Sequence, residues 1–83
     1  MRIYSVYDEK MDGFGIPMFF HSDGVAIRSF SDEVNRRAPD NNLNRHPDDF
    51  SLFFLGIFND KTGEIVPEVR LVVTSRGVFC ADE

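Results

Sequence analysis

The residues that could act as nucleophile, base or metal ligand are few and poorly spaced. The chain of 83 residues contains one cysteine, Cys80, and two histidines, His21 and His46. A zinc site built from four Cys and His ligands is therefore excluded. Ser22 follows His21, but adjacent residues of an extended segment point to opposite sides, which argues against a nucleophile–base pair. These residues predict no catalytic site, no metal and no cofactor, so we expect a protein that is not an enzyme.

A second group of side chains could bind nucleic acid. Nine phenylalanines and two tyrosines offer aromatic platforms on which the bases of a single strand could stack, with arginines contacting the phosphates. The alternative is that acidic neighbours on a solvated helix face neutralise the arginines while the phenylalanines form the core. The residues alone favour the alternative. The candidate nucleic-acid-binding residues are Arg28, Arg36, Arg37 and Arg45.

The composition limits the class of protein. A chain of 83 residues with 42% hydrophobic and 28% charged residues is typical of one small globular domain, here residues 1–83. The net charge of −5 argues against a protein that coats DNA without sequence preference. No apolar run approaches the roughly 20 residues of a membrane span, and the first ten residues do not resemble a signal peptide. We therefore expect a reduced, intracellular setting without membrane contact.

The periodicity of the sequence predicts an α+β fold. We expect an antiparallel sheet of four or five strands with one helix packed on one face, in the order β-β-α-β-β. Ser22 is a suitable N-cap for the helix. Residues 69–74 are expected to be extended and could pair with residues 78–80 across a turn at 75–77. The main strands are predicted at residues 2–7, 18–21, 50–58 and 64–66, and the helix at residues 23–36.

The predicted strand over residues 50–58 is apolar on both faces. One face should pack against the helix, through contacts of Ala26, Ile27, Phe30 and Val34 with Phe50, Leu52 or Phe54. The other face needs a cover, which could be the C-terminal segment or a second protein chain. We predict a homodimer. The expected dimer interface consists of Phe53, Leu55 and Ile57.

Several segments together resemble a known viral family. The chain opens with Arg-Ile-Tyr-Ser-Val-Tyr-Asp at residues 2–8 and continues with Ala-Ile-Arg-Ser-Phe-Ser-Asp-Glu-Val-Asn at residues 26–35. His-Pro-Asp-Asp-Phe-Ser-Leu-Phe follows at residues 46–53, and a hairpin at residues 56–63. In this order and spacing, the chain resembles the small non-structural protein of gokushoviruses, single-stranded DNA phages of the Microviridae. The resemblance covers residues 2–65, and Phe54 and Ile57 depart from it because polar residues are more usual there.

The resemblance implies a protein made in the cytoplasm of the infected bacterium and absent from the virion. It also implies a role in replication of the viral single-stranded DNA, by modest DNA binding or by control of a phage or host replication protein. The alternative is a homodimeric protein-interaction module that binds a phage or host protein without contacting DNA. Arginines that converge and lie free of Asp32 and Glu33 would favour DNA binding, whereas dispersed and paired arginines would favour the module.

Overall fold

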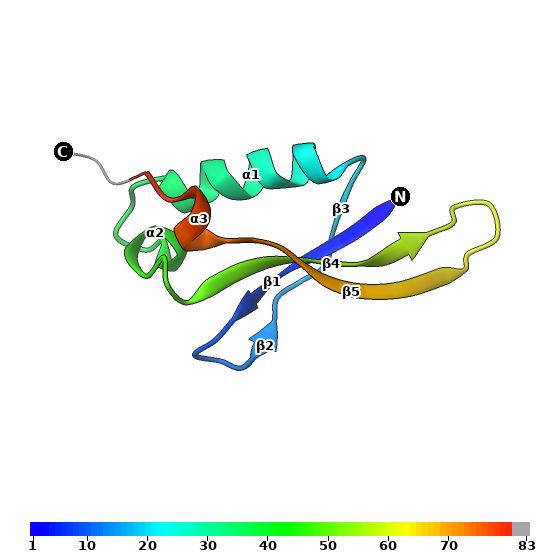
Figure 1. The fold of residues 1–83 in the computed structure, drawn as a ribbon, viewed down its shortest axis with the longest axis horizontal. Helices are drawn as coiled ribbons and strands as arrows, with labels where there is room; N and C mark the ends of the chain where they lie inside the picture. Colours follow the sequence, from blue (N-terminus) through cyan, green and yellow to red (C-terminus); the bar gives the residue numbers. More distant parts are fainter. Residues whose placement is uncertain (81–83) are drawn as a thin grey trace.

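The computed structural model describes residues 1–80 and shows an antiparallel sheet with helices on one side (Figure 1). This confirms the predicted α+β class. Helix α1 lies along the sheet, and each of the two short helices lies at the end of the molecule that is remote from the N-terminus (Figure 1). The strands are β1 (Arg2–Asp8), β2 (Gly13–Phe14), β3 (Met18–Phe20), β4 (Phe50–Phe58) and β5 (Ile65–Thr74), and the helices are α1 (Asp23–Asn35), α2 (Asn42–Arg45) and α3 (Ser75–Val78).

The sheet has the strand order β2-β1-β4-β5, and β3 also pairs with β1. All pairings are antiparallel. Strands β2 and β3 pair with opposite ends of the same edge of β1, so β1 and β4 form the centre and β5 forms the other edge. Strand β4, which carries apolar residues on both faces, lies at the centre, as expected for a strand with a neighbour on each side.

Helix α1 covers one face of the sheet. Ser22 caps it as predicted, since its side chain accepts a hydrogen bond of 3.2 Å from the backbone of Val25. The helix buries Ala26, Phe30 and Val34 against the central strands, while Ile27 is half-buried. The predicted packing of the helix against Leu52 and Phe54 is therefore confirmed for Ala26, Phe30 and Val34. The buried core cluster consists of Tyr4, Ala26, Phe30, Val34, Leu52 and Phe54.

The polar segment after α1, for which the sequence predicted no helix or strand, contains the short helix α2 and caps α1. The side-chain amide of Asn41 donates to the backbone oxygens of Glu33 at 2.8 Å and Arg36 at 2.7 Å. Asn44 donates to the backbone oxygen of Val34 at 3.0 Å. The carbonyls of Val34 and Arg36 would otherwise lack a partner at the end of the helix, whereas that of Glu33 also accepts from the backbone N–H of Arg36 at 3.2 Å. The asparagines of this segment thus terminate the helix, in addition to Pro39.

The C-terminal region differs from the prediction. Strand β5 runs without interruption through Pro67, because an edge strand can place the missing N–H of proline on the side without a neighbour. The expected strand at residues 78–80 is wrong, since residues 75–78 form α3 instead. Thr74 caps α3 by accepting from the backbone of Gly77 at 3.0 Å. Asn35 then holds the chain beyond α3 through hydrogen bonds with Val78 and Cys80 at 3.0 and 2.7 Å.

A bulge in β4 exchanges the faces of its last residues. Phe54 lies opposite Tyr4, whereas Gly56 lies opposite the preceding residue of β1, Ile3, so Leu55 is the extra residue. Gly56 has φ 151°, and a Cβ there would lie 2.3 Å from the backbone oxygen of Val66. Only glycine suits this conformation. As a result, residues after the bulge lie on the face opposite to that predicted by simple alternation.

Candidate interaction surface

Within residues 1–80, no helix lies on the sheet face opposite α1, and this face carries apolar side chains. Tyr7, Phe14 and Phe53 contact one another edge to face, with ring centroids 5.1 to 6.0 Å apart. Leu71 is the cross-strand neighbour of Phe53, and Val69 lies two residues before it on the same side of β5. Leu71 and Val69 are 52% and 64% exposed. We call these five residues the open face.

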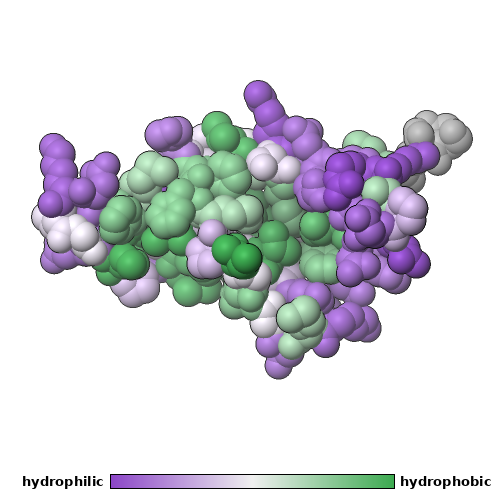
Figure 2. Space-filling model, turned by 180° about the vertical axis from the view of Figure 1, so that it is seen from behind, coloured by the Kyte–Doolittle hydropathy of each residue, from purple (hydrophilic) through white to green (hydrophobic). Residues whose placement is uncertain are grey.

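Hydrophobic surface is not restricted to the open face. Figure 2 shows hydrophobic side chains across the middle of the molecule seen from behind, between hydrophilic ends. Ile65 and Val66 at the start of β5 are each 62% exposed, and Phe19 on β3 is 48% exposed. Contiguous apolar surface of this kind on a small protein is typical of an interaction site.

The three residues predicted as a dimer interface do not lie together. Phe53 belongs to the open face and Leu55 occupies the bulge. Ile57 lies opposite Arg2, whose guanidinium is over the Phe54 ring on the helix side at 4.4 Å. Because cross-strand partners share a face, Ile57 lies on the helix side of the sheet. The sequence did not reveal this, since the glycine of the bulge gave no sign of the register shift.

The predicted nucleic-acid residues are all exposed on the helical side. Arg36 pairs with Glu33 at 2.6 Å, and this pair holds the pKa of Glu33 below its usual range. Arg45 donates to the backbone oxygen of Pro39 at 3.2 Å. Arg28 lies about two helical turns before Arg36, roughly 12 Å along the axis. The structure therefore brings two of these arginines into local contacts and leaves Arg28 apart.

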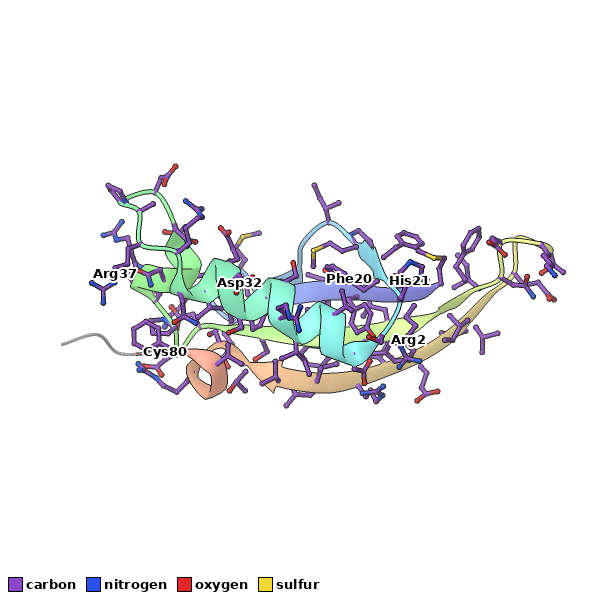
Figure 3. All side chains as sticks on the ribbon, turned by 90° about the horizontal axis from the view of Figure 1, so that it is seen from above. Arg2, Phe20, His21, Asp32, Arg37 and Cys80 are labelled. Atoms are coloured by element: carbon purple, nitrogen blue, oxygen red, sulfur yellow. The ribbon has the colours of Figure 1, made fainter. Side chains whose placement is uncertain are left out.

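The arginines and the exposed aromatic rings lie on different sides of the sheet. Figure 3 shows Arg37 at the end of α1 farthest from Arg2. The aromatic cluster of Tyr7, Phe14 and Phe53 is on the open face, where α1 does not reach. A single strand of DNA could not stack on these rings and contact the arginines of α1 within one short site.

A groove of about 540 Å³ lies between α1 and the strands β1, β3 and β4. Its walls include Phe20, Phe30 and Leu43. The Glu33–Arg36 pair is at the same groove. The lining is mainly apolar and continues the core, so the groove offers space but few groups for chemistry.

A polar cluster that the sequence did not predict connects three elements. Asp23, at the start of α1, accepts hydrogen bonds of 3.0 Å from Arg2 and from Arg70, and another from the hydroxyl of Tyr4. The Tyr4 hydroxyl, and then the two arginines, lower the pKa of Asp23 to about 2 although partial desolvation opposes them. Both guanidinium groups also lie over the Phe54 ring. The cluster fixes the helix to β1 and β5, which is a structural role.

The comparison with known proteins identifies the family. A family model described as Phage ORF5 protein matches residues 1–78. The chain belongs to the Phage ORF5 protein family. It is also 36% identical, over 86 aligned positions, to Protein ORF5 of Chlamydia phage 1, with 99% of this chain and 90% of that protein covered. No solved structure matches the chain.

Membership of the Phage ORF5 family confirms the resemblance to a small Microviridae protein and establishes a phage protein. Within residues 1–80 of this family member, no helix is long and apolar enough to span a membrane. The same residues contain no group of three or more His, Cys, Asp or Glu side chains that could hold a metal ion. What the described surface offers is apolar contact area, concentrated on the open face and along β5.

Proposed function

We propose that this Phage ORF5 protein is a homodimeric protein-interaction module that acts by binding and not by catalysis. The observation that carries the proposal is the open face, on which aromatic and aliphatic side chains remain accessible although they belong to a well-formed sheet. Burying such side chains contributes about 25 cal/mol per Å² of apolar surface. A second copy of the chain is the partner to which we commit.

The charges around the sheet favour a protein partner over DNA. The turn at residues 8–12 has three acids and one lysine, and the turn at residues 59–64 has two acids and one lysine. Both turns are thus net negative, by two charges and by one. Phosphates would be repelled at the ends of the sheet, where an extended strand on the open face would have to pass. Any contribution to replication of the viral DNA would then come from contacts with proteins of the replication machinery, in the infected cytoplasm and outside the virion.

The oligomeric state tests the proposal directly. We expect sedimentation equilibrium at micromolar concentration to give the mass of a dimer. Leu71→Glu, which places a charge on the open face, should give a monomer that retains its far-UV circular dichroism. Val25→Glu is the matched control, because Val25 is similarly exposed at 50% but lies on α1. A monomeric parent chain, or equal loss of dimer in both variants, would contradict the proposal.

Single-stranded DNA binding is the second candidate, favoured by the exposure of Arg28 on α1, Arg45 on α2, and Arg36 and Arg37 directly after α1. If about three phosphates are contacted, the slope of log affinity against log salt should be near −2. Arg28→Glu with Arg37→Glu should flatten that slope. Lys10→Glu with Lys61→Glu is the control with the same change in net charge. No binding at low salt, or equal effects in both double variants, would reject DNA binding at these arginines.

A further inference from the structure

Strand β5 is an unprotected edge of unusual length. It spans ten residues, Ile65–Thr74, and β4 is its one neighbour within the described residues. At about 3.3 Å per residue this edge is roughly 33 Å long. Edge strands usually carry features that prevent pairing with another chain, such as shortness or several charges. Here the features of that kind are Pro67, the charged residues Glu68 and Arg70, and two shifts in the register with β4, one at Val72 and one between Pro67 and Arg70.

The sequence of β5 is nearly symmetric about Val69. It reads Ile-Val-Pro-Glu-Val-Arg-Leu-Val-Val over residues 65–73, with three apolar residues at each end and an acid and a base on either side of the central valine. In an antiparallel pair of identical strands centred on Val69, Glu68 of each strand lies opposite Arg70 of the other. The next pair, Pro67 with Leu71, is apolar. Val72 is an extra residue in the register with β4, so regular pairing is expected to end there.

The geometry of the two charged side chains suits this register. Arg70 Nε lies 3.8 Å from Glu68 Oε2 within the chain, so both side chains are on the helix side of the strand. Glu68 is 68% exposed, whereas Arg70 is 40% exposed and also donates to Asp23 at 3.0 Å. Opposite charges facing each other across strands are stabilising, whereas like charges are not. The pattern therefore complements a second copy of the same strand.

We propose that two copies pair through their β5 strands, antiparallel and centred on Val69, to form one continuous sheet. This inference rests on the proposed homodimer and specifies its interface. It places the two open faces side by side, with Val69 and Leu71 of both copies at the seam. Pro67 removes one N–H donor per chain. Because β4 uses the backbone groups on its side of β5, only the residues whose N–H groups point to the free edge can donate to the partner.

Site-specific crosslinking tests the register. In a Cys80→Ser background, Val69→Cys places the two thiols directly opposite each other, where the Cα separation of about 4.5–5.5 Å permits a disulfide. Leu71→Cys is the matched control on the same strand and face. In the proposed register its two thiols are offset by four residues, or about 13 Å along the strand, too far for a disulfide. We expect mild oxidation to crosslink the first variant and to leave the second as single chains on a non-reducing gel.

Charge reversal provides an independent measurement. Glu68→Arg places arginines opposite each other at two positions of the seam and should raise the dimer dissociation constant about tenfold. Glu64→Arg makes the same change in charge in the turn before β5 and is the control. It should leave the dimer dissociation constant unchanged.

The outcomes separate this inference from the proposed function. A dimeric mass with selective crosslinking at position 69 supports both. A dimeric mass with no preference for position 69 over position 71, or with equal effects of the two charge reversals, overturns edge pairing and leaves the homodimer intact. A monomeric parent chain overturns both the homodimer and the edge pairing. The proline and the charged residues of β5 then act only to prevent pairing with another chain.

Discussion

The two faces of the sheet use the same strands for different purposes. On the helix side, Tyr4, Leu52 and Phe54 are almost completely buried beneath α1. On the open face, alternate residues of the same strands include Tyr7 and Phe53, whose rings contact each other without a covering element. The contrast shows that stability is concentrated on one face, which leaves the other face available for binding.

Ser5 is an exception to the contrast between a buried helix side and an accessible open face. Ser5 lies on the side of the open face, opposite Phe53, yet it is fully buried. Its hydroxyl donates to the backbone oxygen of Gly15 at 2.7 Å, and Gly15 in turn donates to the backbone oxygen of Val6 at 2.8 Å. The segment between β2 and β3 therefore covers part of the sheet beside β1. The accessible surface extends from the aromatic cluster toward β5.

The largest loss of stability is expected from a substitution on the helix side of the sheet. Phe30→Ala should lower the free energy of unfolding by about 3–5 kcal/mol, because it leaves a cavity in the core beneath α1. This is most of the stability of a domain of this size. Urea denaturation followed by circular dichroism measures the change.

Leu71→Ala is the comparison on the open face. In dilute monomeric samples it should change the free energy of unfolding by no more than about 0.5 kcal/mol. A loss similar to that of Phe30→Ala would show that the open face is packed and would remove the contrast between the faces.

The next largest loss of stability is expected from a substitution at Gly56, in the bulge that moves the last residues of β4 to the opposite face. Gly56→Ala should cost about 2–3 kcal/mol, because the added Cβ meets the backbone of Val66 and the residue has a positive φ. Gly63→Ala is the control, since Gly63 also has a positive φ, 81°, but nothing lies within 4 Å of the added Cβ. It should cost only about 1 kcal/mol. Thermal denaturation measures both losses of stability. If Gly56→Ala and Gly63→Ala lose the same amount, the contact between the added Cβ and the backbone of Val66 is relieved without a cost in stability.

The smallest effect concerns the Asp23 cluster. Asp23→Asn should lower stability at pH 7 by about 1 kcal/mol, a value reduced by the exposure of about a third of the side chain. The pKa of Asp23 is lowered from 3.8 to about 2. Its stabilisation is therefore complete above about pH 4 and is lost as the pH falls toward 2. The difference between variant and parent should shrink from pH 7 to pH 2.5, and a constant difference would exclude the ionised carboxylate as its cause.

Much of the fold could be predicted from local pattern. The helical spacing of Ala26, Phe30 and Val34 and the cap at Ser22 predicted α1 to within one residue of its end. The apolar run predicted β4 with the bounds that the structure has. The C-terminal region was mispredicted because its helix depends on distant partners. Ser75 is fully buried and donates to the backbone oxygen of Phe50 at 2.9 Å, and Asn35 binds the segment that follows.

The sequence by itself determined the α+β class, the small core beneath one amphipathic helix, and an excess of apolar residues over what that helix can cover. These follow from residue type and spacing, which act over a few neighbours along the chain. Only the tertiary structure decided which of the excess residues share a surface. The bulge at Gly56 moves Ile57 to the helix side, and strand order makes β5 an edge and places Tyr7 and Phe14 beside Phe53. Strand order and register arise from pairings between residues far apart in the sequence, so no local pattern specifies them.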